Sequence, residues 1–356
     1  MKIFLNAYIQ KNLGDDLFVK IITERYKNHE FIVPDKAKYL VEDNFSFYQQ
    51  NDKINNIIKA FTLGRVSIQN KTMKKADYSV SIGGSMYIER NYKGLKKIIY
   101  SLLYVPKYDF IIGANFGPYK TTRFFRKYHN AFQKAKDVCL RDKYSYDLFK
   151  DIKHCRYAPD IIFSLDTSKF INKKSKRVII SVIDCTKRSQ DTISKKYFTK
   201  IVEIINYYRK AGYKVCLMSF CKLEGDEEAI KKVLDMLDNK NNIETYFYDG
   251  NIDEALNKIG DSSIIVGTRF HANIIGLVFG KKVIPISYSD KTLNVLNDIN
   301  YGNPIIDINN IDSFDISDLD LKYKNSNLDI YQIKQQSLKH FCNLDNLLLK
   351  EGDNIE

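Results

Sequence analysis

Residues 262–292 decide the fold, with the sequence SSIIVGTRFHANIIGLVFGKKVIPISYSDKT. The apolar run at 262–266 predicts a buried strand that ends at Gly267, and the apolar segment after it predicts a helix that ends at Gly280. A second strand is predicted at 283–287. The order strand, turn, helix, strand is typical of one unit of a parallel sheet.

The turn of this unit, Thr268-Arg269-Phe270-His271, predicts an anion-binding site. A helix N-terminus presents backbone N–H groups and the positive end of the helix dipole where the strand stops. Taken alone, His271 fits a helix-start residue bonded to the backbone, and Arg269 fits an interdomain ion pair. Together at one helix N-terminus, the two side chains favour a functional site.

Length and charge narrow the class of protein. The chain has 356 residues, 44% of them hydrophobic, which is enough for two domains that each bury a core. Its net charge of +13 indicates an acidic partner, such as a phosphorylated substrate, an anionic membrane or a nucleic acid, or else a lysine-rich composition without one. The basic residues are spread among acidic ones without aromatic stacking motifs, so we expect no nucleic-acid partner.

Several absences in the sequence point to a cytoplasmic protein. The six cysteines form no CxxC pair and no zinc spacing, so we expect reduced thiols in the core. The apolar start at 1–5 is too short for a signal peptide, and Lys107 and Asp109 interrupt the longest apolar tract. No cluster of His, Asp and Glu has metal-ligand spacing, so we expect no metal.

Strands alternate with helices in both halves of the chain, which predicts parallel βαβ units. The strands are predicted at residues 2–8, 31–34, 78–82, 109–116, 137–140, 161–165, 178–182, 214–219 and 244–248, before the unit at 262–292. Further helices are predicted at residues 17–27, 54–63, 92–105, 122–135, 195–209, 224–237 and 252–259. The fold class is therefore α/β, with two Rossmann-like domains whose mainly parallel sheets face a central cleft.

The polar, aperiodic segment KFINKKSK places a linker between these domains. We expect an N-terminal, acceptor-side domain at 1–168, the linker at 169–176, a C-terminal, donor-side domain at 177–328, and a helix and tail at 329–356. The amphipathic helix predicted at 331–349 should pack back over the domain junction. The basic segments 92–105 and 120–127 predict either solvated helix faces or contact with an anionic membrane at its inner surface.

Polar residues gather where the predicted strands end. At the first sheet these are Asn12, Gly14, Asp15, Asp16, Gly83, Gly84, Ser85, Asn115 and Arg141, and at the second Arg269, Phe270, His271, Ser289 and Lys291. Either Asp15 or Asp16 can cap the helix that follows, which leaves the other as a base or a sugar-hydroxyl acceptor. A cleft with carboxylates on one side and a basic anion site on the other suits transfer from an anionic donor to a polar acceptor.

In these residues the chain resembles the polysaccharide pyruvyl transferase family. The matching motifs are Asn12-Leu13-Gly14-Asp15-Asp16, Gly83-Gly84-Ser85, Gly113 with Gly117-Pro118, Arg141-Asp142 with Ser145, Pro159-Asp160, Gly225-Asp226 and Gly267-Thr268-Arg269-Phe270-His271-Ala272. They fall in the family's order and span about 280 residues. The chain departs from the family at Ser85, usually a third glycine, and at Ile183-Asp184, where many members have an arginine that Lys187 or Arg188 would replace.

The resemblance implies a GT-B-like enzyme that transfers pyruvate from phosphoenolpyruvate to two hydroxyls of a sugar. The product would be a cyclic ketal on a cell-surface polysaccharide or its lipid-linked precursor, with phosphate released and no cofactor. Arg269 and Arg141 would clamp the donor, helped by Phe270, Ser289 and Lys291.

His271 would protonate C3 of the donor, and Asp15 or Asp16 would take the hydroxyl proton. Asn12, Gly14, Gly83, Gly84, Ser85 and Asn115 would line the acceptor side.

Two other functions fit parts of the sequence. A GT-B glycosyltransferase that uses a nucleotide sugar would hold a diphosphate with the same basic residues of the second domain. A non-catalytic basic protein that binds membrane or nucleic acid would show salt-dependent binding without turnover.

Overall fold

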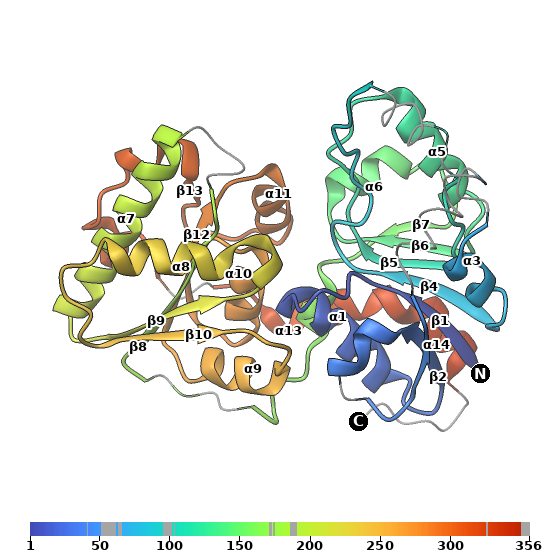
Figure 1. Ribbon diagram of the computed structural model, residues 1–356, viewed down its shortest axis with the longest axis horizontal. Helices are drawn as coiled ribbons and strands as arrows, with labels where there is room; N and C mark the ends of the chain where they lie inside the picture. Colours follow the sequence, from blue (N-terminus) through green and yellow to red (C-terminus); the bar gives the residue numbers. More distant parts are fainter. Residues whose placement is uncertain are drawn as a thin grey trace. The chain divides into compact units, whose positions relative to one another are not determined.

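The computed structural model describes residues 1–40, 42–50, 62, 66–94, 102, 104–170, 173, 175–185, 191–324 and 327–349. The chain forms two compact units (Figure 1). Unit 1 comprises Met1–Ile9, Phe18–Ile161 and Gln336–Glu356, and unit 2 comprises Gln10–Leu17 and Ile162–Gln335. Most of the helices predicted at 54–63 and 92–105 lies outside the described residues, as do Lys187 and Arg188.

Unit 1 is built on a seven-stranded parallel sheet with the order β3-β2-β1-β4-β5-β6-β7. Its strands are β1 (Lys2–Asn6), β2 (Glu30–Pro34), β3 (Phe45–Tyr48), β4 (Tyr78–Ile82), β5 (Phe110–Ala114), β6 (Asp137–Leu140) and β7 (Cys155–Tyr157). Its helices are α1 (Leu13–Arg25), whose first turn belongs to unit 2, η1 (Asp35–Tyr39), α3 (Ile68–Met73), α5 (Thr122–Phe132) and α6 (Lys143–Phe149).

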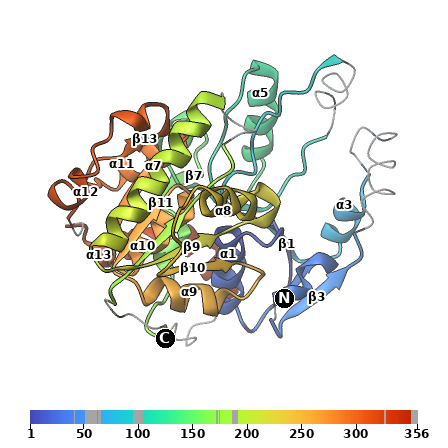
Figure 2. The ribbon, with the colours of Figure 1, turned by 60° about the vertical axis from the view of Figure 1, so that its left-hand side comes forward.

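Unit 2 repeats this arrangement with six parallel strands in the order β10-β9-β8-β11-β12-β13. They are β8 (Arg177–Ser181), β9 (Lys214–Ser219), β10 (Ile243–Phe247), β11 (Ile264–Gly267), β12 (Lys282–Ser287) and β13 (Ile306–Asp307). The helices are η2 (Ile161–Ser164), α7 (Asp191–Lys210), η3 (Lys222–Glu224), α8 (Asp226–Asp235), α9 (Ile252–Gly260), α10 (Phe270–Val278), α11 (Asp290–Asp298), η4 (Ile308–Ser313), α12 (Asp318–Leu321) and α13 (Ile330–Ser337). Helices α7 and α8 lie together on one face of this sheet and α9 lies on the other (Figures 1 and 2).

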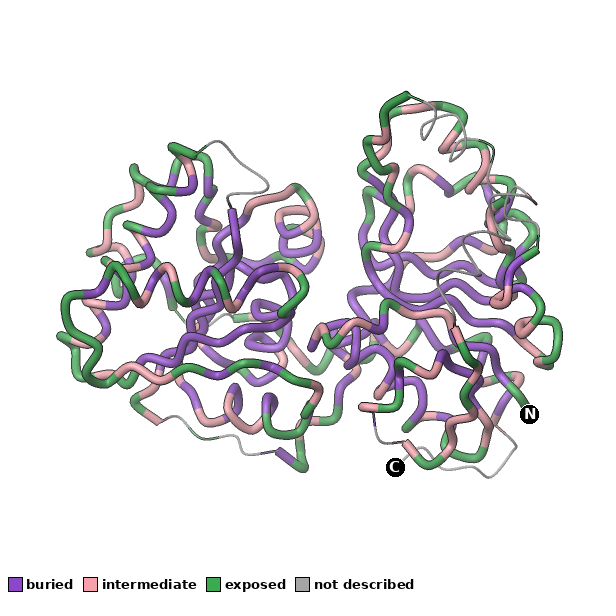
Figure 3. The backbone as a smooth tube through the Cα atoms, in the orientation of Figure 1, coloured by how far each residue is buried: buried purple, intermediate pink, exposed green. Residues whose placement is uncertain are grey.

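The central strands are mainly apolar, as expected where helices cover both faces of a parallel sheet. In unit 2, Ile180, Val266 and Ile284 are fully buried and belong to the same core cluster as Tyr197 and Ile201 of α7. The central strands of both units are accordingly buried along their length (Figure 3). Five of the six cysteines also lie in the interior, as predicted, whereas Cys342 is exposed.

In each sheet the strand order reverses once, between β1 and β4 and between β8 and β11. Ligands of such sheets bind outside the carboxyl ends of the strands at this switch point. The predicted strand, turn, helix and strand at 262–292 are confirmed as β11, α10 and β12. The turn that carries Arg269 and His271 therefore lies at the switch point of the second sheet.

The C-terminal segment is not the single helix predicted at 331–349. It forms α13, a 3-10 turn η5 (Leu338–Phe341) and α14 (Cys342–Leu348). In unit 1, Asp345 of α14 accepts hydrogen bonds from Nε and Nη2 of Arg25 at 2.8 and 2.7 Å. This bidentate ion pair fixes α14 to α1, and the predicted position of the segment over the domain junction stays a prediction.

Candidate active site

The turn after β11 is held by Ser181, the last residue of β8. The backbone N–H groups of Thr268 and Arg269 both donate to Ser181 Oγ at 3.1 Å. The hydroxyl of Thr268 lies 2.9 Å from that of the buried Tyr197 in α7. These contacts keep Arg269 extended directly before the first turn of α10.

Arg269 is buried and paired with two carboxylates. Its Nε lies 2.9 and 3.1 Å from the two carboxylate oxygens of Asp226, its Nη2 also pairs with Asp226, and its Nη1 pairs with Glu224. Burial alone would lower the pKa of the Arg269 guanidinium, but the charges of Asp226 and Glu224 outweigh burial and hold that pKa above its ordinary value. The guanidinium is therefore a fixed positive charge at the N-terminus of α10.

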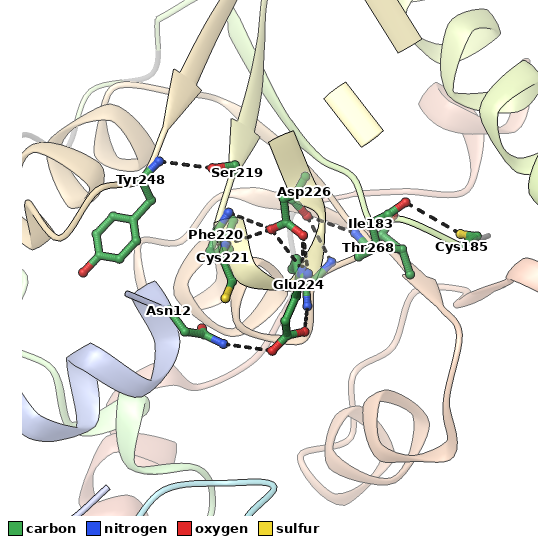
Figure 4. Close-up of polar contacts among 12 residues, drawn as sticks. Asn12, Ile183, Cys185, Ser219, Phe220, Cys221, Glu224, Asp226, Tyr248 and Thr268 are labelled. Carbon is green, nitrogen blue, oxygen red and sulfur yellow. Dashed lines mark hydrogen bonds and ion pairs between the residues drawn. The ribbon is translucent and has the colours of Figure 1, made fainter. Parts of the chain in front are cut away.

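Asp226 is fixed from the other side by the backbone. Its Oδ2 accepts the N–H groups of Phe220 and Cys221, each at 2.9 Å (Figure 4). Gly225, just before it, has φ +88°, a conformation that favours glycine, and this bend separates Asp226 from Glu224. Asp226 belongs to the Gly225-Asp226 motif noted in the sequence, but the sequence assigned no role to it or to Glu224.

The first turn of α1 belongs to this site. Asn12 pairs antiparallel with Cys221, and its Nδ2 donates to Glu224 Oε1 at 3.5 Å (Figure 4). Its Oδ1 accepts the N–H of Gly14 at 3.2 Å, which caps α1. The sequence assigned residues 10–17 and 162–168 to the N-terminal domain, whereas both segments group with unit 2. For the first segment, the bridge to Cys221 is the physical reason.

Gly14 is where α1 meets His271. A Cβ atom at Gly14 would lie 1.7 Å from Nδ1 of the His271 ring, so the imidazole rests directly on the glycine backbone. The ring also lies edge to face with Phe270, with their centroids 4.9 Å apart, and His271 is 8% exposed. Gly14 is therefore needed for the position of His271, while its contact with an acceptor stays a prediction.

The two aspartates of α1 differ in their surroundings. Asp16 is fully buried and accepts a hydrogen bond of 2.7 Å from the hydroxyl of Tyr248, a residue that the sequence did not single out. Tyr248 is itself held through its N–H by Ser219 Oγ at 3.1 Å (Figure 4). Asp15 keeps 9% of its surface exposed. Of the two, Asp15 has the better access to a ligand.

The remaining donor-side residues lie around Phe270. Lys291 of α11 places its Nζ 4.5 Å from the centroid of the Phe270 ring, a cation–π contact. Ser289 lies at the N-terminal cap of α11, where its N–H donates to Ser287 Oγ at 3.4 Å. Phe270 and Lys291 are thus neighbours of His271 and Arg269, and their contact with a donor stays a prediction.

In unit 1, the buried side chain of Arg141 contacts two of the predicted acceptor residues, Asn115 and Gly84. Its Nη1 donates to Asp160 at 2.7 Å and its Nη2 to Asn115 at 2.8 Å, with no surface exposed. A Cβ atom at Gly84 would lie 2.1 Å from Nη2, and Ser85 Oγ donates to Asn115 at 3.5 Å. Arg141 therefore positions this loop, and the predicted contact with a donor would require it to become exposed.

Gly83 begins this loop directly after β4, with φ +126°. Within the described ranges, no group of three or more His, Cys, Asp and Glu could hold a metal ion. The helices in the same part of the chain include none long and apolar enough to cross a membrane.

Solved structures with the same fold include two enzymes of sugar metabolism. The UDP-GlcNAc 2-epimerase from Neisseria meningitidis, bound to UDP-GlcNAc, matches with a TM-score of 0.58 and 11% identity over 98% of this chain and 100% of its own. A glycosyltransferase from Rickettsia africae matches with a TM-score of 0.54 and 13% identity over 98% of this chain and 96% of its own. The protein therefore has a GT-B-like fold of two Rossmann-like domains.

Sequence comparison is more specific. The amylovoran biosynthesis protein AmsJ of Erwinia amylovora is 22% identical over 254 residues, which cover 64% of this chain and 60% of AmsJ. The profile of the polysaccharide pyruvyl transferase family matches residues 12–290, from the cap of α1 to the start of α11. Since this match includes Gly14, Asp16, Asp226, Arg269 and His271 and most of both units, the chain belongs to the polysaccharide pyruvyl transferase family.

Proposed function

We propose that this protein transfers pyruvate from phosphoenolpyruvate to two hydroxyls of a sugar. The acceptor is a unit of a cell-surface polysaccharide or its lipid-linked precursor, and the products are a cyclic ketal and phosphate. The observation that carries the proposal is that the backbone of α1 at Gly14, directly before Asp15, lies against the His271 ring of unit 2, two residues from Arg269 at the switch point. Phosphoenolpyruvate is the co-substrate, and the scheme uses no cofactor.

The reaction needs an acid and a base. His271 gives a proton to C3 of the donor, which becomes a methyl group as C2 becomes electron-deficient. The first sugar hydroxyl adds to C2 and loses its proton to Asp15. The C2–O bond to phosphate then breaks, and the leaving phosphate takes the proton from Asp15. The second hydroxyl adds to C2, and its proton returns to His271, so both side chains regain their starting protonation states. All atoms are thus accounted for in one ketal and one phosphate.

The charges around Arg269 support binding of an anionic donor beside His271. Asp226 is bound within the protein by two N–H groups and Arg269, so it fixes the guanidinium while the helix dipole of α10 adds attraction for an anion. Lys291 adds a second cation beside Phe270. A donor with a carboxylate and a phosphate has two anionic groups, which matches two cationic contacts.

An acceptor carried on a membrane lipid would explain why helix α5 of unit 1 is basic. Arg123 and Arg126 are exposed, and burial together with the neighbouring Arg123 lowers the pKa of Lys127. Such crowding of like charges favours an anionic surface. We therefore propose that the enzyme acts in the cytoplasm at the inner face of the cell membrane, where a lipid-linked acceptor would lie.

A test of the function uses purified protein with phosphoenolpyruvate and a lipid-linked or polysaccharide acceptor. We expect phosphate release and the mass increment of a pyruvate ketal on the acceptor. His271→Ala should lower kcat by about 100-fold or more through loss of the acid. Arg269→Lys should raise KM for the donor, because lysine keeps the charge but loses the planar fork that holds Asp226.

Arg177→Ala serves as the control, because Arg177 begins β8 at the strand end opposite Ser181 and pairs with Asp261. Arg177→Ala should leave kcat and the KM for phosphoenolpyruvate unchanged. Release of a nucleoside diphosphate from a UDP-sugar, without phosphate release from phosphoenolpyruvate, would instead identify a nucleotide-sugar glycosyltransferase.

A further inference from the structure

Arg269 pairs with two carboxylates where one would neutralise it. The first, Asp226, is fully buried and is bound to Nε and Nη2 of Arg269 and to two backbone N–H groups. It belongs to the permanent framework of unit 2. The second, Glu224, adds a net negative charge to a site that is built to receive an anion.

Glu224 differs from Asp226 in burial. Its side chain is 26% exposed, whereas that of Asp226 is fully buried, and its contacts include Nη1 of Arg269 and, at 3.5 Å, Nδ2 of Asn12. It ends the short turn η3, and Gly225 with φ +88° separates its backbone from that of Asp226. Glu224 can therefore rotate away from Arg269 without moving the buried carboxylate.

The chemistry of Glu224 matches that of the donor. A glutamate side chain and the carboxylate of phosphoenolpyruvate are equivalent partners for a guanidinium N–H group. Asp226 covers Nε and Nη2, so Nη1 is the part of Arg269 that faces the partly exposed carboxylate. A donor that binds Arg269 at Nη1 must displace Glu224.

From the proposed function, on which this step rests, we infer that Glu224 is an internal competitor that occupies the donor-carboxylate position on Arg269. Glu224 thus sets the affinity for the donor, and it keeps the guanidinium paired while the site is empty. Displacement leaves α1 capped, because Asn12 holds Gly14 through its other amide atom, Oδ1.

The experiment measures the Kd of phosphoenolpyruvate by calorimetry for wild type and Glu224→Gln. Glutamine keeps the size and can still accept from Asn12, but it lacks the charge that competes for Arg269. We expect the Kd to fall about tenfold, equivalent to about 1.4 kcal/mol. Glu224→Asp, which keeps the charge on a shorter side chain, should remain closer to wild type.

Glu227→Gln is the matched control. Glu227 lies three residues further along, pairs with Lys222 at 3.4 Å and makes no ion pair with Arg269 among the described residues. It removes the same charge from the same segment and should leave the Kd within about twofold of wild type, a difference smaller than the tenfold step of 1.4 kcal/mol. Thermal unfolding of each variant establishes that it is folded.

The possible results distinguish a failure of the Glu224 inference from a failure of the proposed function. Equal or weaker binding by Glu224→Gln, with normal binding by wild type, would overturn the competitor role alone. An equal gain in Glu227→Gln would also overturn it, since general charge would then be the cause. Failure of wild type to bind phosphoenolpyruvate at all would overturn the proposed function and this inference together.

Discussion

The contact between Gly14 and His271 is the most sharply defined feature of the site at the scale of single residues. The glycine has no side chain, and the imidazole ring occupies the space where a Cβ would lie. An acid that donates a proton must be held at a fixed position relative to C3 of the donor. The backbone of α1 thus determines the position of the His271 side chain of α10, the proposed acid.

Gly14→Ala should therefore impair catalysis by moving His271. Because the new methyl group would lie 1.7 Å from Nδ1, the ring must shift, and we expect kcat to fall by about 100-fold. Phosphate release from phosphoenolpyruvate measures the effect. The double variant Gly14→Ala/His271→Ala should be no slower than His271→Ala, because both changes remove the same function.

Gly302→Ala is the control for this substitution. Gly302 is exposed, and a Cβ there would meet no described atom within 4 Å. It should leave kcat and the melting temperature unchanged. A Gly14→Ala variant that is folded and keeps wild-type kcat would show that His271 is not the acid, or that its position does not matter.

At the scale of elements, the sequence predicted the local units better than the contacts between them. The unit β11-α10-β12 follows from an apolar period and from Gly267 and Gly280, which are local signals. Tyr248 lies 232 residues from Asp16, and no pattern in either segment predicts the hydrogen bond between them. The pairing of Asn12 with Cys221 was missed for the same reason, since it depends on the tertiary fold.

The attachment of η5 to unit 1 depends on a neutral histidine. His340 is fully buried; its Nδ1 accepts the N–H of Gly113 in β5 at 3.3 Å, and its Nε2 lies 2.9 Å from the carbonyl of Pro159. Burial, with a smaller contribution from the charges of Arg156 and Arg141, lowers the pKa of His340 from 6.5 to about 3. Protonation would place a hydrogen on Nδ1 against the Gly113 N–H.

Acid should therefore destabilise the protein through His340. Below pH 6.5 the unfolded chain binds a proton on His340, whereas the folded chain binds it only near pH 3. The contribution of neutral His340 to the free energy of unfolding is therefore complete above pH 6.5 and decreases as the pH falls from 6.5 to about 3. From pH 6.5 to about pH 5 the loss is about 2 kcal/mol.

Urea unfolding at a series of pH values measures this dependence. In His340→Gln the stability should be lower at neutral pH, but its slope against pH in this window should be smaller by about one proton. An unchanged slope in the variant would mean that another group is responsible.

At the scale of the whole molecule, two sheets with the same strand order share a fold with enzymes that differ in chemistry. A fold does not determine a reaction, so the function rests on the residues at the switch point of unit 2. Arg269 there is already paired with two carboxylates, those of Glu224 and Asp226. The attraction of an anionic donor over long distances must therefore come from the remainder of the chain.

The net charge of +13 supplies such a field, and this makes donor capture sensitive to salt. Raising the ionic strength from about 0.01 M to about 0.15 M shortens the Debye length from about 30 Å to about 8 Å. We expect kcat/KM for phosphoenolpyruvate to fall about tenfold over this range, while kcat at saturating donor stays nearly constant, because screening acts on encounter and not on proton transfer within the bound complex. Steady-state phosphate release at several salt concentrations measures both constants, with sucrose as an uncharged control. A value of kcat/KM that does not change with salt would mean that the basic residues reflect composition alone and play no part in attracting the donor.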